Sequence, residues 1–272
     1  MRLGIFAKTF PGTEPAAVLT AARQAGYETT QFNLACAGLP SMPDAVAANV
    51  IMAIRAAARS TGVSLAALSG TYNMAHPDKA ARDDGLRRLA VVIETAAALD
   101  IPLVTLCTGS RNGADQWAYH PDNATPAAWS DMAAEMEKAL ALAEAAGVDL
   151  GIEPEQANIV TSAKDATKLI REMGSKHLKM VLDPANLFEH ATPGEARAIV
   201  AAAIDEAAGH IAMAHAKDRH GDGRFATTGQ GIVDFPDFVA RLKAAGFDGP
   251  LVTHGLSADE APGVAAFLRR LL

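Results

Sequence analysis

The sequence repeats one pattern eight times along its length. Each unit is a short apolar run, then a few polar residues, then a longer segment whose apolar residues recur every three or four positions. Short apolar runs bounded by turn residues indicate buried strands, and the longer spacing indicates helices. The strands are expected at residues 3–7, 28–33, 64–69, 101–107, 149–153, 177–182, 210–215 and 250–253.

The segments between these runs predict one helix after each strand. The helices are expected at residues 14–25, 43–61, 77–99, 127–146, 163–173, 194–208, 236–245 and 262–271. Such alternation requires parallel strands, and eight units of this length close most naturally into an α/β fold, a single (β/α)8 TIM barrel. A doubly wound open sheet is the alternative. No Ser- or Gly-rich linker divides residues 1–272, so one barrel domain is expected.

Charge and cysteine content narrow the function classes. The formal net charge is -7 and no Lys/Arg cluster forms a stripe, which argues against nucleic acid as a partner. The two cysteines, Cys36 and Cys107, form no CxxC pair and suit a reducing compartment. No segment reaches the ~20 apolar residues that a membrane-spanning helix needs. We therefore expect a cytoplasmic protein without a membrane partner.

A long loop at residues 108–126 separates the fourth strand from the fourth helix. Loops of more than about 12 residues without their own secondary structure are usually functional or disordered. This one carries Arg111, Trp117, His120 and Asn123, and its aromatic residues argue against disorder. The loop is expected to form a lid or a pocket wall.

Polar residues close most of the expected strands. In a barrel of this kind the active site lies at the carboxyl ends of the strands. The strand-closing residues and their neighbours are Lys8, Gln31, Asn33, Ser69, Tyr72, Asn73, His76, Cys107, Thr108, Glu153, Asp183, His215 and His254. The site is therefore expected among these side chains.

Four of these residues form a candidate metal set: Glu153, Asp183, His215 and His254, from strands five to eight. Carboxylate and imidazole ligands without thiolate suit Mn²⁺, Co²⁺, Mg²⁺ or Zn²⁺. Taken singly, each residue has an ordinary explanation, since a carboxylate before proline often caps a loop and a lone histidine is often a core residue. Four ligand types at the ends of four consecutive strands are improbable by chance, which favours the metal site.

These residues resemble the sugar phosphate isomerase/epimerase family of the xylose isomerase-like TIM barrels, along essentially the whole chain. The most specific segments are Gly-Ile-Glu-Pro at 151–154, Leu-Asp-Pro-Ala-Asn at 182–186, Ala-His-Ala-Lys-Asp at 214–218 and Gly-Gln-Gly-Ile-Val-Asp-Phe at 229–235. The family includes ketose 3-epimerases, hydroxypyruvate isomerase, inosose dehydratase and type IV endonucleases. Its ligands are a Glu, an Asp, a His and a final Glu. The first three carry over to Glu153, Asp183 and His215, whereas His254 stands in the last position.

The resemblance implies a metal-dependent isomerase or epimerase that removes a proton next to the carbonyl of a small keto sugar, through an enediolate. Glu153 is the expected base, and His254 either completes the metal sphere or returns the proton. The residues expected to hold substrate hydroxyls are His76, Arg111, His120, Asn186, Lys217 and Asp218.

Three alternatives remain open at this point. A lyase or dehydratase acting on a keto sugar or an inosose would share the same first step. A phosphodiesterase like the type IV endonucleases would need more metal-binding histidines, for which His76 and His120 are the candidates. A non-catalytic sugar-binding barrel is the third. A small sugar is the expected partner, and assembly into a homo-oligomer is left open.

Overall fold

Eight parallel strands close into a barrel in the structure, a computed structural model that describes residues 1–272. Their order around the barrel is β1-β10-β7-β6-β5-β4-β3-β2, and β10 pairs in parallel with β1 to close the ring. The strands are β1 (Arg2–Phe6), β2 (Thr29–Phe32), β3 (Ser64–Ser69), β4 (Leu103–Leu106), β5 (Asp149–Ile152), β6 (Leu178–Leu182), β7 (Ile211–Ala216) and β10 (Pro250–Thr253). The predicted (β/α)8 barrel is confirmed.

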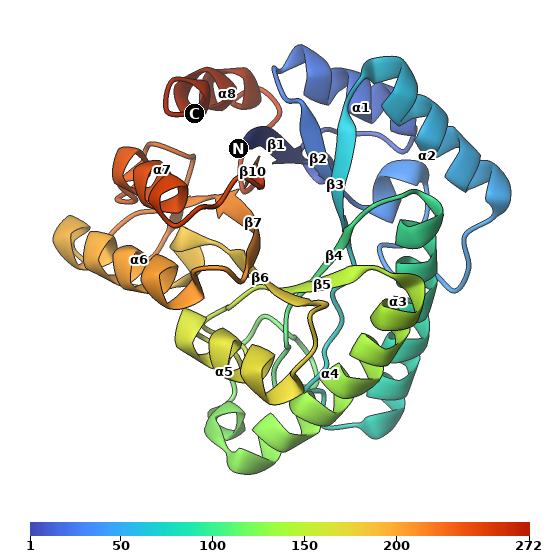
Figure 1. The fold of residues 1–272 in the computed structure, drawn as a ribbon, viewed down its shortest axis with the longest axis vertical. Helices are drawn as coiled ribbons and strands as arrows, with labels where there is room; N and C mark the ends of the chain where they lie inside the picture. The colour runs from blue at the N-terminus through green and yellow to red at the C-terminus, as the bar shows by residue number, and fades with distance from the viewer.

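A ring of helices surrounds the strands, one after each of them (Figure 1). The helices are α1 (Pro15–Gln24), α2 (Ala48–Thr61), α3 (Lys79–Ala98), α4 (Pro126–Ala146), α5 (Ala163–Met173), α6 (Pro193–Ala207), α7 (Phe235–Ala244) and α8 (Ala261–Arg269). Their inner faces join the outer faces of the strands in one apolar core. The predicted helix at 43–61 is shorter than expected, because residues 43–47 form no helix.

The barrel interior is a second, smaller apolar cluster below the strand ends. It consists of Ala67, Leu103, Val181, Met213 and Val252. Gly151 also faces this interior, since a Cβ atom there would lie 2.8 Å from Val181 and 3.1 Å from Leu103. Side chains alternate along a strand, so the residues two positions further on point into the barrel again, one layer higher. This layer is where the candidate site lies.

One additional β-hairpin, which the periodic pattern does not predict, lies outside the barrel sheet. Directly after β7, β8 (Asp218–Arg219) pairs antiparallel with β9 (Phe225–Ala226). The Asp218 carboxylate accepts hydrogen bonds from the backbone N–H groups of Arg219, Gly229, Gly231 and Val233, at 2.8 to 3.1 Å. This carboxylate therefore fastens the hairpin and the following glycine-rich turn to the end of β7.

The predicted lid, residues 108–126, is irregular apart from a short 3₁₀ helix at Pro121–Ala124. Its inner side is held by Asn123, whose side chain contacts Ser110 and donates to the carbonyl of Ala157 at 2.8 Å. Its outer side exposes Trp117 and Tyr119. The segment is thus tied to its neighbours by buried polar contacts, while Tyr119 is exposed and the half-exposed Trp117 borders the barrel mouth.

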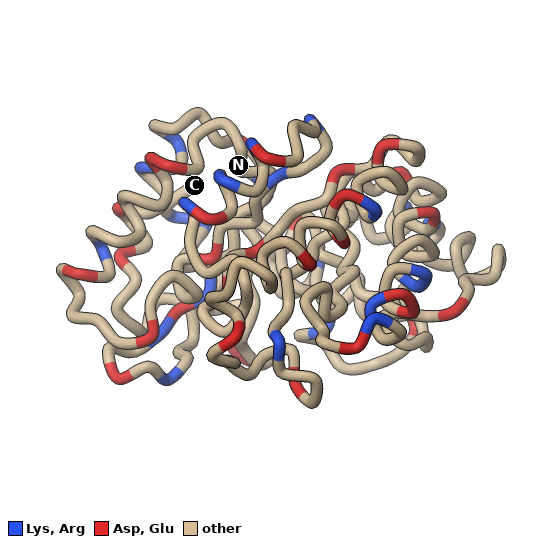
Figure 2. Tube along the Cα trace, turned by 90° about the horizontal axis from the view of Figure 1, so that it is seen from below, with Lys and Arg blue, Asp and Glu red and all other residues tan.

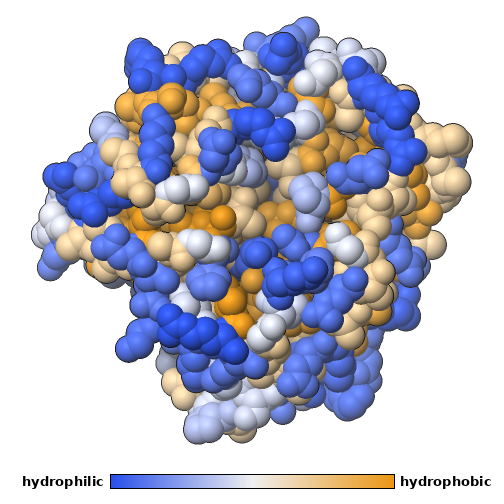
Figure 3. Space-filling view, in the orientation of Figure 1, coloured by the Kyte–Doolittle hydropathy of each residue, from blue (hydrophilic) through white to orange (hydrophobic).

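The surface mixes charges of both signs. Lys/Arg and Asp/Glu residues are interspersed along the trace in Figure 2. On the face shown in Figure 3, hydrophilic residues break up the hydrophobic ones. None of the helices is both long and apolar enough to span a bilayer.

Candidate functional site

One layer of side chains fills the barrel mouth above the apolar interior. Glu153, Asp183 and His215 lie two residues beyond Gly151, Val181 and Met213 of the interior. His254 lies two residues beyond Val252 in the same way. The other half of the barrel contributes Phe6, Gln31, Ser69 and Thr105, which line the same pocket as Glu153, His215 and His254. Strand periodicity alone therefore brings these eight side chains together.

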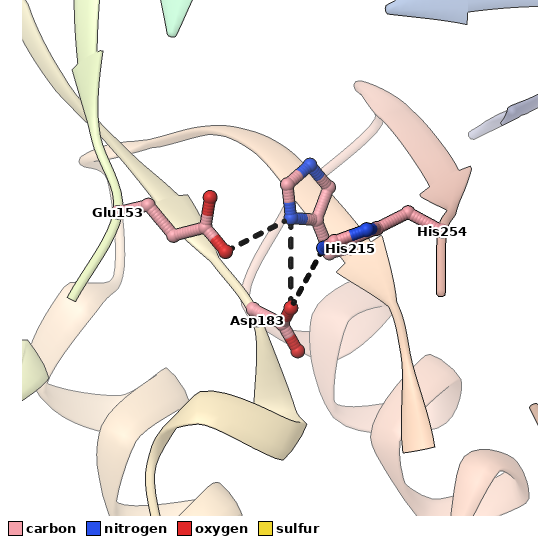
Figure 4. A group of neighbouring side chains, drawn as sticks. All are labelled: Glu153, Asp183, His215 and His254. Carbon is pink, nitrogen blue, oxygen red and sulfur yellow. Dashed lines mark hydrogen bonds and ion pairs between the residues drawn. The ribbon is translucent and has the colours of Figure 1, made fainter. Parts of the chain in front are cut away.

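The four predicted metal ligands do converge. One ligand atom from each of Glu153, Asp183, His215 and His254 lies within 4.8 Å of the others. His215 Nδ1 is 3.2 Å from Glu153 Oε1 and 3.6 Å from Asp183 Oδ2, and His254 Nε2 is 3.7 Å from the same Asp183 oxygen (Figure 4). Two carboxylates and two imidazoles thus point toward one place.

Asp183 provides the best test of whether a cation fits there. Its side chain is fully buried, and Oδ1 accepts a hydrogen bond from the backbone N–H of Ala185. Oδ2 is buried and has no partner within hydrogen-bond distance, since His215 Nδ1 is 3.6 Å away. A buried carboxylate oxygen without a partner is costly unless a cation or a donor compensates it. The oxygen and nitrogen donors around it suit a divalent ion of the Mn²⁺, Co²⁺, Mg²⁺ or Zn²⁺ class.

Gln31 sets the orientation of His215. The amide nitrogen of Gln31 donates to the hydroxyls of Ser69 (3.1 Å) and Thr105 (3.0 Å). Its oxygen therefore faces His215 and accepts from Nε2–H at 2.8 Å. With the proton fixed on Nε2, the lone pair of Nδ1 is available on the side of the carboxylates. This is the usual way in which a protein prepares a histidine for a metal.

The carboxylates govern the protonation of His215. Burial on its own lowers the pKa of this imidazole, but Glu153 and Asp183 outweigh burial and raise it to about 9. Burial likewise acts to raise the pKa of Asp183, yet the nearby His215 imidazole, 3.6 Å away, and the charge of Lys217 hold that pKa well below its usual range. Without a metal ion, a proton on His215 Nδ1 therefore supplies the positive charge that the two carboxylates require.

His254 has the opposite tendency. Burial, the charge of His215 and that of Lys217 lower its pKa to about 3. Its ring packs edge-on against His215, with centroids 4.9 Å apart, and against Phe6 at 5.9 Å. A neutral imidazole is a ligand or a proton acceptor at pH 7 and cannot donate a proton as a strong acid would. This favours the metal-binding role among the two that the sequence left open for His254.

Glu153 is held by one oxygen only. Its Oε1 accepts from Asn186 Nδ2 at 2.8 Å, and Asn186 Oδ1 in turn accepts from Lys217 Nζ at 3.2 Å. No hydrogen bond involves Oε2, and the residue lines the pocket. One oxygen is thereby positioned while the other can approach a ligand. Asn186 and Lys217, predicted to hold substrate hydroxyls, both line the pocket and also help to orient Glu153.

The pocket has two adjoining lobes. The first, about 360 Å³, contains the layer described above together with Lys8, Asn33 and Trp117. The second, about 350 Å³, is lined by Glu155, Asn186, Lys217 and Phe225. Cys107, Trp117, Glu153 and His254 line both lobes. Cavities of this size accommodate small molecules.

Four of the predicted substrate-binding residues lie outside both lobes. His76 accepts from the backbone of Asp78 and contacts the carbonyl of Gly113, in a separate shallow cleft. His120 caps the 3₁₀ helix of the lid.

The other two have their functional groups engaged elsewhere. Arg111 is paired with Asp131 at 2.6 Å, and Asp218 is fully buried with its carboxylate taken up by backbone N–H groups. Local hydrogen bonds in the loops explain all four placements.

Other residues of the pocket received no role from the sequence. Gln31 and Ser69 were expected at strand ends but without a function, and Thr105 was not singled out, although the period-two alternation of β4 would have indicated it. Glu155 lies two residues after Glu153, and burial followed by the charge of Glu153 raises its pKa to about 7. Phe225, which lines the second lobe, and Arg219, which packs on its ring, belong to a hairpin whose two-residue strands give no periodic signal.

Comparisons with known proteins were made for the sequence and the fold. The sequence model of the xylose isomerase-like TIM barrel family matches residues 19–271. No curated protein matches the chain. A solved structure of L-ribulose 3-epimerase has 21% sequence identity and a TM-score of 0.79, covering 100% of this chain and 94% of its own.

Two further structures are similar along their whole length. A 3-keto-D-glucoside 4-epimerase from E. coli has 17% identity and a TM-score of 0.78, covering 99% of both chains. A D-psicose 3-epimerase from Clostridium cellulolyticum H10, solved with D-tagatose, has 17% identity and a TM-score of 0.75, covering 100% of this chain and 99% of its own. At these identities the likeness establishes the fold, and function must be argued from the site.

Proposed function

The chain belongs to the xylose isomerase-like TIM barrel family, and we propose that it is a metal-dependent sugar isomerase or epimerase. Its reaction removes the proton next to the carbonyl of a small keto sugar and passes through an enediolate. The observation that carries this proposal is the state of Glu153. One oxygen is fixed by Asn186 while the other faces the pocket, beside a cluster of ligand atoms within 4.8 Å of one another.

Glu153, Asp183, His215 and His254 would hold a divalent ion. When bound, such an ion acts as a Lewis acid that polarises the carbonyl and stabilises negative charge on its oxygen. The protein's own residues do the rest. Glu153 Oε2 takes the proton from carbon, and Asn186 keeps this carboxylate aimed at the pocket. In an isomerisation Glu153 returns the proton to the adjacent carbon, whereas in an epimerisation water supplies a proton to the opposite face of the enediolate. Gln31 holds the proton of His215 on Nε2, away from the carboxylates.

Sugars named for the similar structures supply the first substrates to test. L-ribulose, D-psicose and D-tagatose are each keto sugars with a carbon-bound proton beside the carbonyl. Their small size suits a pocket whose first lobe measures about 360 Å³. The polar side chains of Lys8, Asn33 and Ser41 line this lobe and can hydrogen-bond sugar hydroxyls.

The test follows solvent deuterium entering each sugar, with the metal-loaded protein. Replacement of a general base commonly costs a factor of about 10² to 10⁴, so Glu153→Gln should slow exchange by roughly that factor. The matched control is Glu137→Gln, an exposed carboxylate on α4, which should exchange like wild type. Metal content is measured for every variant. Exchange by Glu153→Gln at the wild-type rate would sink the proposal.

The same experiment separates the alternatives. A lyase or dehydratase would release a product that has lost water, visible by mass, whereas an isomerase or epimerase conserves mass. The phosphodiesterase alternative needs further metal-binding histidines, and His76 and His120 lie outside the four-residue cluster. A non-catalytic barrel would bind a sugar without any exchange.

A further inference from the structure

The second lobe of the pocket holds a buried cation with no acidic partner. Lys217 is 8% exposed and lines this lobe. Its Nζ donates to the neutral amide oxygen of Asn186 at 3.2 Å. No carboxylate oxygen lies within 4.0 Å of Nζ. Buried lysines are rare unless they are paired, so this one is available to a ligand.

Arg219 is a second buried cation without an acidic partner, and it packs on Phe225 at the border of the lobe. The residue is 7% exposed, its side chain makes no hydrogen bond or ion pair, and its Nε is buried without a partner. Both cations pack on the ring of Phe225: Lys217 Nζ is 3.7 Å and Arg219 Cζ 4.3 Å from its centroid. Two unneutralised cations are therefore neighbours at one aromatic ring.

Other poorly exposed arginines of the chain do have acidic partners. Arg82 lies 3.7 Å from the buried Glu135, and Arg111 lies 2.6 Å from Asp131. The guanidinium of Arg219 is the exception. It occurs next to the candidate active site, in a chain whose formal net charge is -7.

The local charges do not cancel once the metal site is filled. A divalent ion is balanced by Glu153 and Asp183, and its imidazole ligands are neutral. What remains is Lys217 and Arg219 against Glu155. Glu155 lines the lobe, but none of its oxygens lies within 4.0 Å of either cation. The second lobe therefore has a net positive charge and a cavity beside Lys217 that can hold an anion.

We infer that this second lobe binds an anionic group, a carboxylate or a phosphate, carried by the sugar substrate. The inference rests on the proposed function and adds its substrate class. Glu153 and Trp117 line both lobes, so a sugar whose reacting carbon lies beside Glu153 can extend its far end to Lys217. Phe225 closes one side of the lobe and shields the cations from solvent, which strengthens their attraction for an anion.

The experiment is calorimetric binding to the Mn²⁺-loaded protein, with two pairs of probes. D-glucuronate is compared with D-glucose, and D-fructose 6-phosphate with D-fructose. At least one anionic sugar should bind about tenfold more tightly than its neutral counterpart, as expected for hydrogen bonds to a charged group. The pair that shows the preference tells whether the group is a carboxylate or a phosphate.

Two variants test the assignment. Lys217→Met and Arg219→Met should each reduce the preference toward unity. Two variants are needed because Lys217 also holds Asn186, whereas Arg219 does not. The matched control is Lys168→Met, the other lysine stacked on an aromatic ring, at 3.7 Å from the Trp129 centroid and outside both lobes. It should keep the wild-type preference.

Equal binding of anionic and neutral sugars by the wild type would overturn the inference. A preference that survives in either Lys217→Met or Arg219→Met would overturn it as well. Neither result touches the proposed function, which depends on deuterium exchange into neutral keto sugars and on Glu153. Conversely, a protein that exchanges no deuterium still reports its anion preference, because binding is measured without turnover.

Discussion

The two halves of the barrel place different chemistry in the same layer. Strands β1 to β4 contribute neutral side chains to the pocket: Phe6, Gln31, Ser69 and Thr105. Strands β5, β6, β7 and β10 contribute only titratable ones: Glu153, Asp183, His215 and His254. Backbone geometry is alike in both halves, since all eight strands are parallel members of one closed sheet. The difference in function therefore lies entirely in the side chains.

Within this layer one side-chain hydrogen bond joins the two halves, from His215 Nε2 to Gln31 Oε1 at 2.8 Å. Through it the neutral half fixes which nitrogen of His215 carries a proton, and so which one faces the carboxylates. We interpret the charged half as the part that binds a metal and moves a proton. The neutral half orients it and places no charged side chain in this layer.

The largest expected effect on metal affinity comes from replacing one of the candidate metal ligands in the charged half. Asp183→Asn removes the buried oxygen that has no other partner. Loss of a residue that supports a metal ligand costs about 10- to 100-fold in affinity, and loss of a ligand itself should exceed this range. The control is Asp149→Asn, a carboxylate paired with His177 at 2.8 Å at the start of β5. Metal titration that finds Asp183→Asn as tight as wild type would refute the assigned ligand set.

The second effect concerns pH. The pKa of His215 is raised to about 9, so Nδ1 is protonated at pH 7 in the metal-free protein and must lose this proton to bind a metal. Affinity should rise by about tenfold per pH unit from pH 7 and level off near pH 9.

The pKa of His254 is lowered to about 3, so this residue is already neutral and should add nothing to that slope. Calorimetry in buffers of different ionisation enthalpy should count one proton released at pH 7. If metal binding releases no proton at pH 7, His215 is not protonated in the metal-free protein.

Protonated His215 also stabilises the metal-free fold. A raised pKa means that this stabilisation is complete below the unfolded value of about 6.5 and fades as pH rises through about 9. A bound metal takes over the same positive charge. The gain in melting temperature on adding metal should therefore be larger at pH 9 than at pH 7.

The sequence was sufficient for the charged half and insufficient for the neutral one. Their position at the ends of expected strands located Glu153, Asp183 and His215, because the carboxyl ends of the strands meet at one mouth of the barrel. The same rule placed Gln31 at a strand end, yet it assigned this amide no role, because the role depends on the partners of the side chain. Its role comes from Ser69, Thr105 and His215, which are remote in sequence.

Loop residues were harder still to place from the sequence. His76, Arg111 and His120 have side chains directed by local turns and single ion pairs, for which no period exists. Asp218 follows His215 closely in sequence, but its buried carboxylate is used to fasten a turn. In a strand the direction of each side chain follows a regular period and can be predicted from its position. In a loop the direction depends on individual contacts, which show no such regularity in the sequence.

The smallest expected effect on metal affinity tests whether the neutral half orients His215 or only lines the pocket. Gln31→Leu removes the acceptor for His215 Nε2–H while keeping most of the side-chain volume, and metal affinity at pH 9 should fall by about tenfold. Gln31→Glu restores an acceptor oxygen and should bind at least as tightly as wild type, because a carboxylate makes the imidazole a stronger ligand. If Gln31→Leu binds metal normally, orientation of His215 must come from Glu153 and Asp183 alone. The charged half would then be self-sufficient.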